Sequence, residues 1–409
     1  MSQSRLNILI IGGGIGGLTL GQALLQHNIS FRIFERDTSV TYRSQGYRIR
    51  ISGDGVHALQ KCLPQPTWEK LEASAATGMI GMTKIDALTG EVAPKPITGN
   101  GELKGMRHDA KPIAVDRTVM RTVLLSGLEG HIEFGKTFEG YDITDSGIKA
   151  TFTDGTSYDG DTLVGADGSN SLVRKQYLPQ LKVIDTTGRC IYGKTYITPE
   201  LEEAFTPKAM KNMTIIQQQR PDGTPLTLFL EPTRFPNSGL VPIINPKTGE
   251  EEYVKDYVYW VLLSKAHDSL SPTSQFHYLT SAEAAELSVK VTRSWHASVK
   301  PVLALQSSTS TSALRIVSAV PDMPAWEPSR FITLLGDAAH PLPPTAGLGA
   351  VSALRDVELL LDAILKGVSG ESIGEYELEM RKWACEVVQA SKKGAEKFIG
   401  GWDWDTVQV

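Results

Sequence analysis

The chain has 409 residues, of which 41% are hydrophobic, and a formal net charge of −5. This length predicts two or three domains, and the weak negative charge gives no sign of a nucleic-acid or anionic-membrane partner. Cys62, Cys190 and Cys385 form no CxxC pair, so we expect reduced thiols and no metal site. No apolar run approaches the roughly 20 residues of a membrane span. The N-terminus lacks a signal-peptide cleavage pattern, so a soluble, cytoplasmic protein is expected.

The N-terminal segment has the pattern of a β–α–β unit. Residues 6–11 are a short, continuous apolar run, typical of a strand buried on both faces. Residues 15–27 have the spacing of a helix, and residues 31–35 have the pattern of a second strand.

A glycine motif, Gly12-x-Gly14-x-x-Gly17, lies where the first strand meets the helix. Gly12 is expected to make the turn, Gly14 to let the backbone approach a pyrophosphate, and Gly17 to let the helix pack closely. Glu35 ends the second strand, 18 residues after Gly17, where a carboxylate can hold ribose hydroxyls. The motif predicts a dinucleotide site for NAD or FAD; the alternative is a structural turn.

The middle of the chain changes to β character. Turn sequences such as Arg220-Pro-Asp-Gly and Asn245-Pro-Lys-Thr-Gly separate predicted strands at 189–197, 213–219, 226–231 and 257–264. α/β character then returns, with a strand at 331–335, a helix at 350–366 that ends at Gly367, and a helix at 374–397.

These patterns predict an α/β fold in which a Rossmann-like domain for NAD or FAD carries an inserted, mostly antiparallel β-sheet and C-terminal helices. We assign residues 1–75, 105–180 and 325–370 to the cofactor domain. Residues 76–104 and 181–324 are assigned to the substrate sheet, and 371–409 to a C-terminal helical segment.

Two further motifs identify the family. They are Gly165-Ala-Asp167-Gly168-x-x-Ser171-x-x-Arg174 and Gly336-Asp337-Ala-Ala-His340, the second continuing through Pro343-Pro344-x-x-Gly347-x-Gly349. In this order, and together with the first motif, they resemble the FAD-dependent aromatic hydroxylases typified by p-hydroxybenzoate hydroxylase. The resemblance covers nearly the whole chain. Residues 45–50, Gln-Gly-Tyr-Arg-Ile-Arg, are similar to the subset found in fungal secondary metabolism.

The third motif suits a flavin. Asp337 follows an apolar strand and can accept hydrogen bonds from ribityl hydroxyls, and the N-terminus of the next helix favours negative charge at the flavin edge. The resemblance makes His340 a structural member of this motif rather than a base. It implies that Asp167 serves both FAD and NAD(P)H, although Asp167 can also be a turn residue.

The resemblance also assigns three kinds of arginine. Arg117 matches the family's flavin-facing arginine, whereas Arg121 is a weaker candidate on a helix face expected to be solvated. Arg48 and Arg50 align with a strand whose arginine meets the pyrophosphate; alternation places both on one face, so the choice stays open. The full predicted cofactor set is Gly12, Gly14, Ile15, Gly17, Glu35, Arg36, Arg48, Arg50, Arg117, Asp167, Gly168, Gly336, Asp337, Pro344, Gly347, Leu348 and Gly349.

In the family, substrate lies between the inserted sheet and the flavin. The candidate catalytic or lining residues are Arg189, Tyr192, Lys194, Tyr257 and Tyr259. A tyrosine or arginine here can help deprotonate a phenol or hold a phenolate; the alternative is ordinary strand side chains that pack a sheet. Tyr192 and Lys194 share a face and Arg189 lies on the other. No unique catalytic base stands out.

The resemblance implies a monooxygenase. NAD(P)H, with NADPH favoured by analogy, reduces the non-covalently bound FAD, O₂ adds to give a flavin hydroperoxide, and one oxygen atom passes to an electron-rich, aromatic or polycyclic small molecule. Hydroxylation is favoured, with epoxidation and Baeyer–Villiger insertion as alternatives. A flavin halogenase fits less well, because Trp402-Asp-Trp404-Asp lacks the Ile-Pro of the halogenase element. A domain that binds FAD without turnover is the third alternative.

Overall fold

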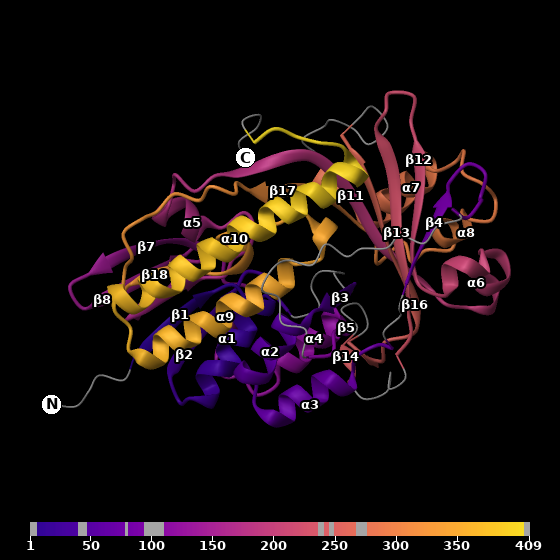
Figure 1. Ribbon diagram of the computed structural model, residues 1–409. Helices are drawn as coiled ribbons and strands as arrows, with labels where there is room; N and C mark the ends of the chain where they lie inside the picture. Colours follow the sequence, from indigo (N-terminus) through magenta and orange to yellow (C-terminus); the bar gives the residue numbers. More distant parts are fainter. Residues whose placement is uncertain are drawn as a thin grey trace.

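A computed structural model describes residues 6–39, 47–77, 81–93, 110–235, 241–244, 249–266 and 276–404. Its first layer is a five-stranded parallel sheet in the order β18-β10-β1-β2-β6. The strands are β1 (Asn7–Ile11), β2 (Ser30–Glu35), β6 (Ile132–Phe134), β10 (Thr162–Gly165) and β18 (Ile332–Leu334). Segments far apart in the chain therefore form one sheet, as Figure 1 shows.

Both faces of this sheet are covered, which explains the unbroken apolar run of β1. Successive side chains of a strand point to opposite faces. Ile10 faces α1 (Ile15–Gln26), because a Cβ at Gly17 would lie 3.4 Å from it, while Leu9 faces β9 (Ser157–Gly160) at Gly160. β9 belongs to a three-stranded antiparallel sheet with β7 (Phe138–Thr144) and β8 (Gly147–Phe152).

The second layer is a six-stranded sheet in the order β17-β11-β16-β13-β12-β4. All neighbouring strands pair antiparallel except β12 and β4, which pair parallel. The strands are β4 (Met82–Asp86), β11 (Val183–Tyr196), β12 (Met213–Gln219), β13 (Pro225–Thr233), β16 (Tyr257–Lys265) and β17 (Ser312–Ala319). In Figure 1 this sheet stands beside the parallel sheet and α10 extends from one to the other.

The remaining elements complete the two layers. Strand β3 (Arg48–Ile51) pairs antiparallel with β5 (Ile113–Asp116), and β14 (Ile243–Ile244) with β15 (Glu251–Glu252). The other helices are α2 (Gly53–Cys62), α3 (Gln65–Ala73), α4 (Arg117–Leu125), α5 (Leu172–Tyr177), α6 (Pro199–Ala204), α7 (Ser281–Val291), α8 (Pro301–Ala304), α9 (Gly349–Lys366) and α10 (Gly370–Ile399).

The predicted elements are found with small shifts of their ends. The main difference is β11, which begins at Val183, six residues before the expected start, because a register shift between Asp185 and Arg189 lets the strand continue along β17. Gly367 ends α9 with a φ of 106°, as predicted. The turn from Arg220 links β12 and β13, whereas the turn from Asn245 and part of the 45–50 stretch lie outside the described residues.

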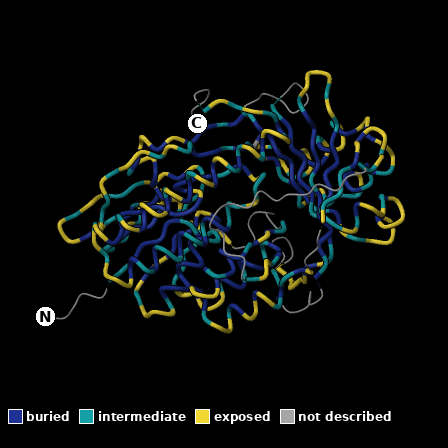
Figure 2. Tube along the Cα trace, in the orientation of Figure 1, coloured by how far each residue is buried: buried dark blue, intermediate teal, exposed yellow. Residues whose placement is uncertain are grey.

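Buried residues run through both layers (Figure 2). The inserted sheet buries its two faces separately. One face packs with Trp260, Leu262 and Leu228 against α7 and α8, and the other, with Cys190, Tyr192 and Val261, meets the C-terminal part of α10. Cys62, Cys190 and Cys385 are free thiols, as expected. Among the described residues, no helix has the length and apolar character to cross a bilayer.

One buried acid makes stability depend on pH. Glu377 of α10 is 1% exposed and accepts hydrogen bonds from Thr333 of β18 at 2.9 Å and from the Trp326 indole at 2.7 Å. Burial raises the pKa of Glu377 from 4.5 to about 7. The pKa of Glu377 is thus higher in the folded protein than in the unfolded chain, so folding favours the protonated carboxyl group. The stability that this preference adds is fully present below the unfolded pKa of 4.5 and is lost as the pH rises through about 7.

Replacement Glu377→Gln should remove this loss, because the amide does not ionise; its oxygen can accept from the Trp326 indole and its NH2 group can donate to the Thr333 hydroxyl. The stability of the variant relative to the wild type should rise by about 2 kcal/mol between pH 5 and pH 8 in urea unfolding. Glu386→Gln, at an exposed position of the same helix, is the control and should show no such trend. A pH-independent difference for Glu377→Gln would contradict the assignment.

Candidate active site

The first glycine motif forms a turn with an open space at one position. Gly12 has a φ of 114°, and a Cβ there would lie 2.3 Å from the Ala166 carbonyl oxygen. A Cβ at Gly17 would lie 1.9 Å from the Gly12 carbonyl oxygen, so the fold itself requires both glycines. A Cβ at Gly14 would meet nothing within 4 Å. Gly14 is also the N-cap of α1 and offers no side-chain cap, which leaves backbone N–H groups free for an anion.

Two buried charged side chains brace this turn. The Glu35 carboxylate accepts hydrogen bonds from the backbone N–H of Gly13 at 2.8 Å and of Asp37 at 2.9 Å. From the other side, Arg121 donates to the Gly13 carbonyl at 3.1 Å. Arg121 is 5% exposed, so the expectation of a solvated helix face was wrong. The periodicity of α4 could have revealed this, because Arg121 shares a helix face with Leu124 and Leu125.

The second motif holds the third in place. Asp167 accepts hydrogen bonds from the Ser171 hydroxyl at 2.5 Å and the Leu172 N–H at 2.8 Å, so its carboxylate caps α5. Gly168 has a φ of 80° with open space beside it. Arg174, which sequence reasoning left without a role, is buried and donates to the carbonyls of Ser169 and Ala338, both at 2.9 Å. Its place in the motif, on a short buried helix, was the available signal.

In the third motif, one carboxylate is buried and paired. Asp356 of α9 contacts His340 Nε2 at 2.7 Å and accepts a hydrogen bond from the Gly336 N–H at 2.7 Å. His340 and Asp356 are 1% and 0% exposed. Burial lowers the pKa of His340, but the Asp356 carboxylate outweighs it and the net shift is upward. His340 is therefore an anchor for the loop, in agreement with its expected structural role.

The other carboxylate, Asp337, is left available. Solvent reaches its side chain although the neighbouring residues 332–336 and 338–341 are buried, and no described residue donates a hydrogen bond to it. Burial in the surrounding protein raises the pKa of Asp337, while the charges of His340 and Arg117 act in the opposite direction. After the short helix Pro344–Ala346, Gly347 turns the chain with a φ of 65°, and α9 begins at Gly349 without a side-chain cap.

These residues fit FAD. A Cβ would meet nothing at Gly14, Gly168 or Gly347, so the backbone is open to a ligand at one glycine of each motif. The N-terminus of α1, which has no side-chain cap, suits a pyrophosphate. The Asp337 carboxylate, to which none of the described residues donates, suits ribityl hydroxyls. The N-terminus of α9, also without a side-chain cap, suits the electron-rich edge of a flavin.

The two alternative arginines of β3 differ in their exposure and contacts. Arg50 is exposed, whereas Arg48 forms a buried ion pair with Glu231 of the inserted sheet, and its guanidinium lies 5.5 Å from the centre of the Tyr259 ring. Arg48 thus contacts the inserted sheet through one terminal nitrogen, while the exposed Arg50 has room for a pyrophosphate. A pyrophosphate contact of either arginine stays a prediction. Arg36 at the end of β2 is also exposed.

Four of the five substrate-side candidates lie on one face of the inserted sheet. Lys194, Tyr259 and Glu231 are directly opposite one another across β11, β16 and β13. Tyr192 and Tyr257 belong to the neighbouring rows of the same face.

Arg189 does not join this group. Its guanidinium pairs with Asp185 at 2.9 and 3.2 Å and donates to the Gly188 carbonyl, on the face opposite to Tyr192.

Asp116, which sequence reasoning passed over, ties this face to the cofactor domain. One of its oxygens caps α4 by accepting from the Thr118 N–H at 2.8 Å. The other accepts from the Tyr257 hydroxyl at 3.0 Å and lies 3.8 Å from Lys194 Nζ. The signal in the sequence was an acidic residue directly before a helix, the usual place of an N-cap.

The tyrosines of this face are hydrogen-bond donors when protonated. Burial raises the pKa of Tyr192, Tyr257 and Tyr259 above the ordinary value of 10, and Asp116 adds to the rise at Tyr257. A raised pKa favours the protonated form at neutral pH, in which each hydroxyl can donate a hydrogen bond; a part in deprotonating the substrate stays a prediction. Tyr257 is fully buried, which leaves Tyr259 as the partly exposed one.

An aromatic and cationic bridge connects this face with the cofactor domain. Tyr47 meets the Tyr192 ring edge-on at 4.9 Å and stacks on the Tyr259 ring at 6.2 Å. The Arg117 guanidinium lies 5.7 Å from the Tyr47 ring centre. The contacts Arg117–Tyr47–Tyr259 therefore run from the start of α4 to the inserted sheet.

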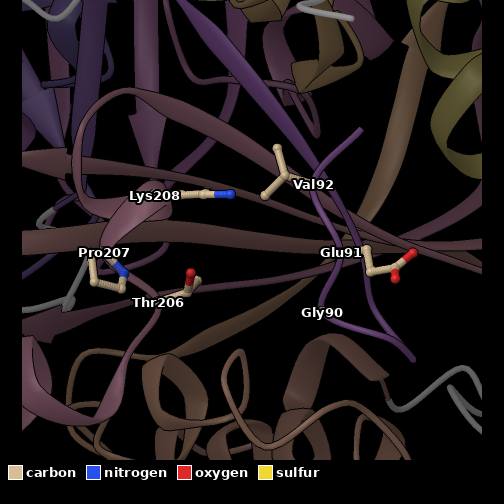
Figure 3. Close-up of a pocket in the computed structure, with 6 residues that line it drawn as sticks. All are labelled: Gly90, Glu91, Val92, Thr206, Pro207 and Lys208. Atoms are coloured by element: carbon tan, nitrogen blue, oxygen red, sulfur yellow. The ribbon is translucent and has the colours of Figure 1, made fainter. Parts of the chain in front are cut away.

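A separate surface hollow has no part in this arrangement. It measures about 580 Å³ and lies where the chain leaves β4 and meets the segment after α6 (Figure 3). Its lining is Gly90, Glu91, Val92, Thr206, Pro207 and Lys208, and none of these is a predicted site residue.

Comparison with known proteins agrees with this geometry. Residues 113–391 match the FAD binding domain family, and residues 10–71 match a family of NAD(P)-binding Rossmann-like domains. The chain therefore belongs to the FAD-binding family, and it binds FAD.

Similar proteins are FAD-dependent monooxygenases by name. A dual O-methyltransferase/FAD-dependent monooxygenase of Cercospora beticola is 35% identical over 96% of this chain and 46% of its own length. An FAD-dependent monooxygenase of Penicillium herquei is 26% identical over 100% of this chain and 94% of its own length. A crystal structure from Photorhabdus luminescens, described as an FAD-containing monooxygenase, is 29% identical with a TM-score of 0.77, covering 96% of this chain and 98% of the other. The chain thus spans about half the length of the dual-function relative.

The open position at Gly14 gives a test of the cofactor site. Gly14→Val should fold normally, because a Cβ meets nothing there and the φ of −76° is allowed, but its side chain should exclude the pyrophosphate. We expect purified protein with little bound flavin in its absorption spectrum and unchanged circular dichroism. Gly130→Val, at an exposed turn that is equally open, is the matched control and should keep its flavin. Normal FAD content in Gly14→Val would place the pyrophosphate elsewhere.

The unpaired carboxylate gives a second test. Asp337→Ala should weaken FAD binding by about 1.5–3 kcal/mol, the usual contribution of a hydrogen bond to a charged group, which corresponds to roughly 10- to 150-fold in Kd. Fluorescence titration of apoprotein with FAD measures the change. Asp322→Ala, an exposed carboxylate after β17, serves as control. Wild-type affinity in Asp337→Ala would make Asp337 a structural residue.

Proposed function

We propose that this protein is an FAD-dependent monooxygenase that inserts one oxygen atom from O₂ into an electron-rich aromatic or polycyclic small molecule, with NADPH preferred to NADH as reductant. The observation that carries the proposal is that the tyrosine-lined face of the inserted sheet packs against the cofactor domain, through Asp116 on Tyr257 and Lys194 and through Arg117 and Tyr47 on Tyr259. The names of the similar proteins support the same activity.

The proposed reaction consumes one O₂ and one NADPH for each ring that is hydroxylated. A ring C–H, O₂, NADPH and a proton give the hydroxylated ring, NADP⁺ and water. NADPH supplies two electrons, one oxygen atom enters the new C–OH bond, and the other leaves as water. Bound FAD supplies the redox chemistry, accepting hydride and activating O₂.

The protein's own residues bind the cofactor and the substrate and orient them. The glycine turns and the N-termini of α1 and α9 receive the charged and electron-rich parts of the cofactor, and Asp337 accepts from its hydroxyls. On the substrate side, the protonated hydroxyl of Tyr259 donates a hydrogen bond, and the rings of Tyr47 and Tyr192 form apolar walls that exclude water. We assign the substrate domain to the inserted sheet, with 76–104 and 181–324 as its extent.

Isotope labelling tests this function. The FAD-loaded protein is screened with NADPH against phenols, naphthols, indoles and polyketide-type aromatics for compounds that stimulate NADPH oxidation. With the strongest of them under ¹⁸O₂, the product should gain one labelled oxygen. The same reaction in H₂¹⁸O under ordinary O₂ is the control and should give unlabelled product. Unlabelled product under ¹⁸O₂, with all reducing equivalents recovered as peroxide, would replace the monooxygenase with an oxidase.

A further inference from the structure

The last turn of α10 lies against the inserted sheet (Figure 1). Thr227 of β13 donates to the Phe398 carbonyl at 3.1 Å, and the Phe229 ring meets the Phe398 ring edge-on at 4.5 Å. Side chains alternate along a strand, so Thr227 and Phe229 share their face with Glu231. Glu231 lies opposite Tyr259. The helix therefore ends on the face that carries the predicted substrate residues.

The segment that follows α10 adds a tryptophan to this face. Gly400 ends the helix with a φ of 81°, and Lys265 of β16 donates to the Gly401 carbonyl at 3.0 Å. Trp402 comes next and packs against the buried cluster that contains Tyr192. Trp402 is itself partly exposed, so its ring lies between that cluster and solvent. A large, flat side chain thus stands at the edge of the substrate face.

A cation of α10 holds the Trp402 ring in this position. Lys392 Nζ lies 5.7 Å from the Trp402 ring centre and 5.6 Å from that of Trp404, and the two rings meet edge-on at 5.8 Å. Glu396 pairs with Lys392 at 2.8 Å. The Trp402 Nε1 is buried and has no hydrogen-bond partner among the described residues. Cation–π contacts at partly exposed sites are individually weak, so they favour one position of the ring without locking it.

The same part of α10 contacts the loop of the third motif. Thr345 donates to the Ser391 carbonyl at 2.9 Å, and a Cβ at Gly394 would lie 3.6 Å from the Thr345 side chain. Lys392 lies between these two contacts in the sequence. Trp402 therefore stands where the inserted sheet, α10 and the loop of the third motif approach one another. In the proposed function, the substrate ring lies between this sheet and the flavin.

We propose that Trp402 is a specificity residue that limits the size of the ring system this site accepts, and that Lys392 and Trp404 hold its ring in the limiting position. This inference rests on the proposed function. A substrate of one or two rings leaves Trp402 in place, whereas a longer one must displace the indole from Lys392 and from the buried cluster. The displaced indole loses apolar burial and its cation–π contact, so longer substrates bind more weakly.

A binding assay with two phenols of different length tests the proposal on the FAD-loaded protein. The probes are 2-naphthol, with two rings, and 2-hydroxyanthracene, with three, and the change in flavin absorbance measures each Kd. The wild type should prefer 2-naphthol. In Trp402→Ala the ratio of the two Kd values should move by about tenfold or more toward 2-hydroxyanthracene, because the third ring gains the space of the indole. An unchanged ratio in Trp402→Ala, a wild type that does not prefer 2-naphthol, or no binding of either probe would overturn the proposal.

Three further variants place the effect on Trp402. Trp402→Phe keeps an aromatic ring at the position and should keep most of the wild-type preference. Lys392→Met removes the cation but leaves Trp402 present, so it should shift the ratio in the same direction as Trp402→Ala by a smaller factor. Tyr278→Ala removes a ring that is 75% exposed and does not belong to the cluster, and this control should keep the full preference. Should Trp402→Ala fail to fold, an unchanged ratio in Lys392→Met overturns the proposal instead.

A fluorine label distinguishes direct contact with the substrate from a remote structural role. In protein that contains 5-fluorotryptophan, Trp402→Phe identifies the ¹⁹F resonance of Trp402 by its loss. Binding of 2-naphthol should shift this resonance, because the substrate ring contacts the indole. Trp295, which is buried on the other face of the inserted sheet and is identified by Trp295→Phe, should keep its resonance. A Trp402 resonance that does not respond to bound 2-naphthol contradicts the proposal.

The outcomes separate this inference from the proposed function. If the preference depends on Trp402 but no ¹⁸O enters any product, the size limit is supported and the monooxygenase function fails. If ¹⁸O enters the product while Trp402→Ala keeps the wild-type ratio, the monooxygenase function is supported and the size limit is overturned.

Discussion

The arrangement of the active site depends on two ion pairs, with little exposure to solvent, that join the cofactor domain to the inserted sheet. Arg48 and Asp116 lie opposite each other on β3 and β5 of the cofactor domain, and their partners Glu231 and Lys194 lie on the inserted sheet. Burying charges is expensive, and an apolar contact of the same size would often be as stable. Charge pairing nevertheless favours the register in which each charge meets its partner. In that register Tyr47 stacks on Tyr259, so an aromatic contact also joins the cofactor domain to the substrate face.

A second network of hydrogen bonds holds the loop of the third motif, residues 336–340, and leaves the Asp337 carboxylate available. Arg174 holds the Ala338 carbonyl, and Asp356 holds both His340 and the Gly336 N–H. The side chains of Arg174, His340 and Asp356 are all buried. Asp337, which lies near them in sequence, is held by backbone geometry with its carboxylate accessible. An available polar group on a rigid, buried frame is what a binding site requires, because the frame has already lost its conformational entropy.

The protonation states of the buried side chains indicate which roles belong to the protein and which to the cofactor. The tyrosines of the substrate face remain protonated because their burial disfavours the phenolate, and His340 is enclosed with Asp356. None of these groups is poised to remove a proton from a substrate carbon at neutral pH. The protein therefore contributes positioning, hydrogen-bond donors and exclusion of water, which matches a site whose reactive chemistry belongs to a bound cofactor.

The sequence by itself determined the class of fold and the cofactor. The glycine spacing, the continuous apolar run of β1 and the order of the three motifs are local patterns, and local backbone sterics and burial dictate them. Tertiary structure decided which side chains meet. Strand alternation placed Arg48 and Arg50 on one face, but only the approach of β13 showed that Arg48 pairs with Glu231. Likewise Arg121, Arg174 and Asp116 gained their roles from partners at least 100 residues away. Such pairings depend on how two separately encoded surfaces fit together, and no spacing within one segment carries that information.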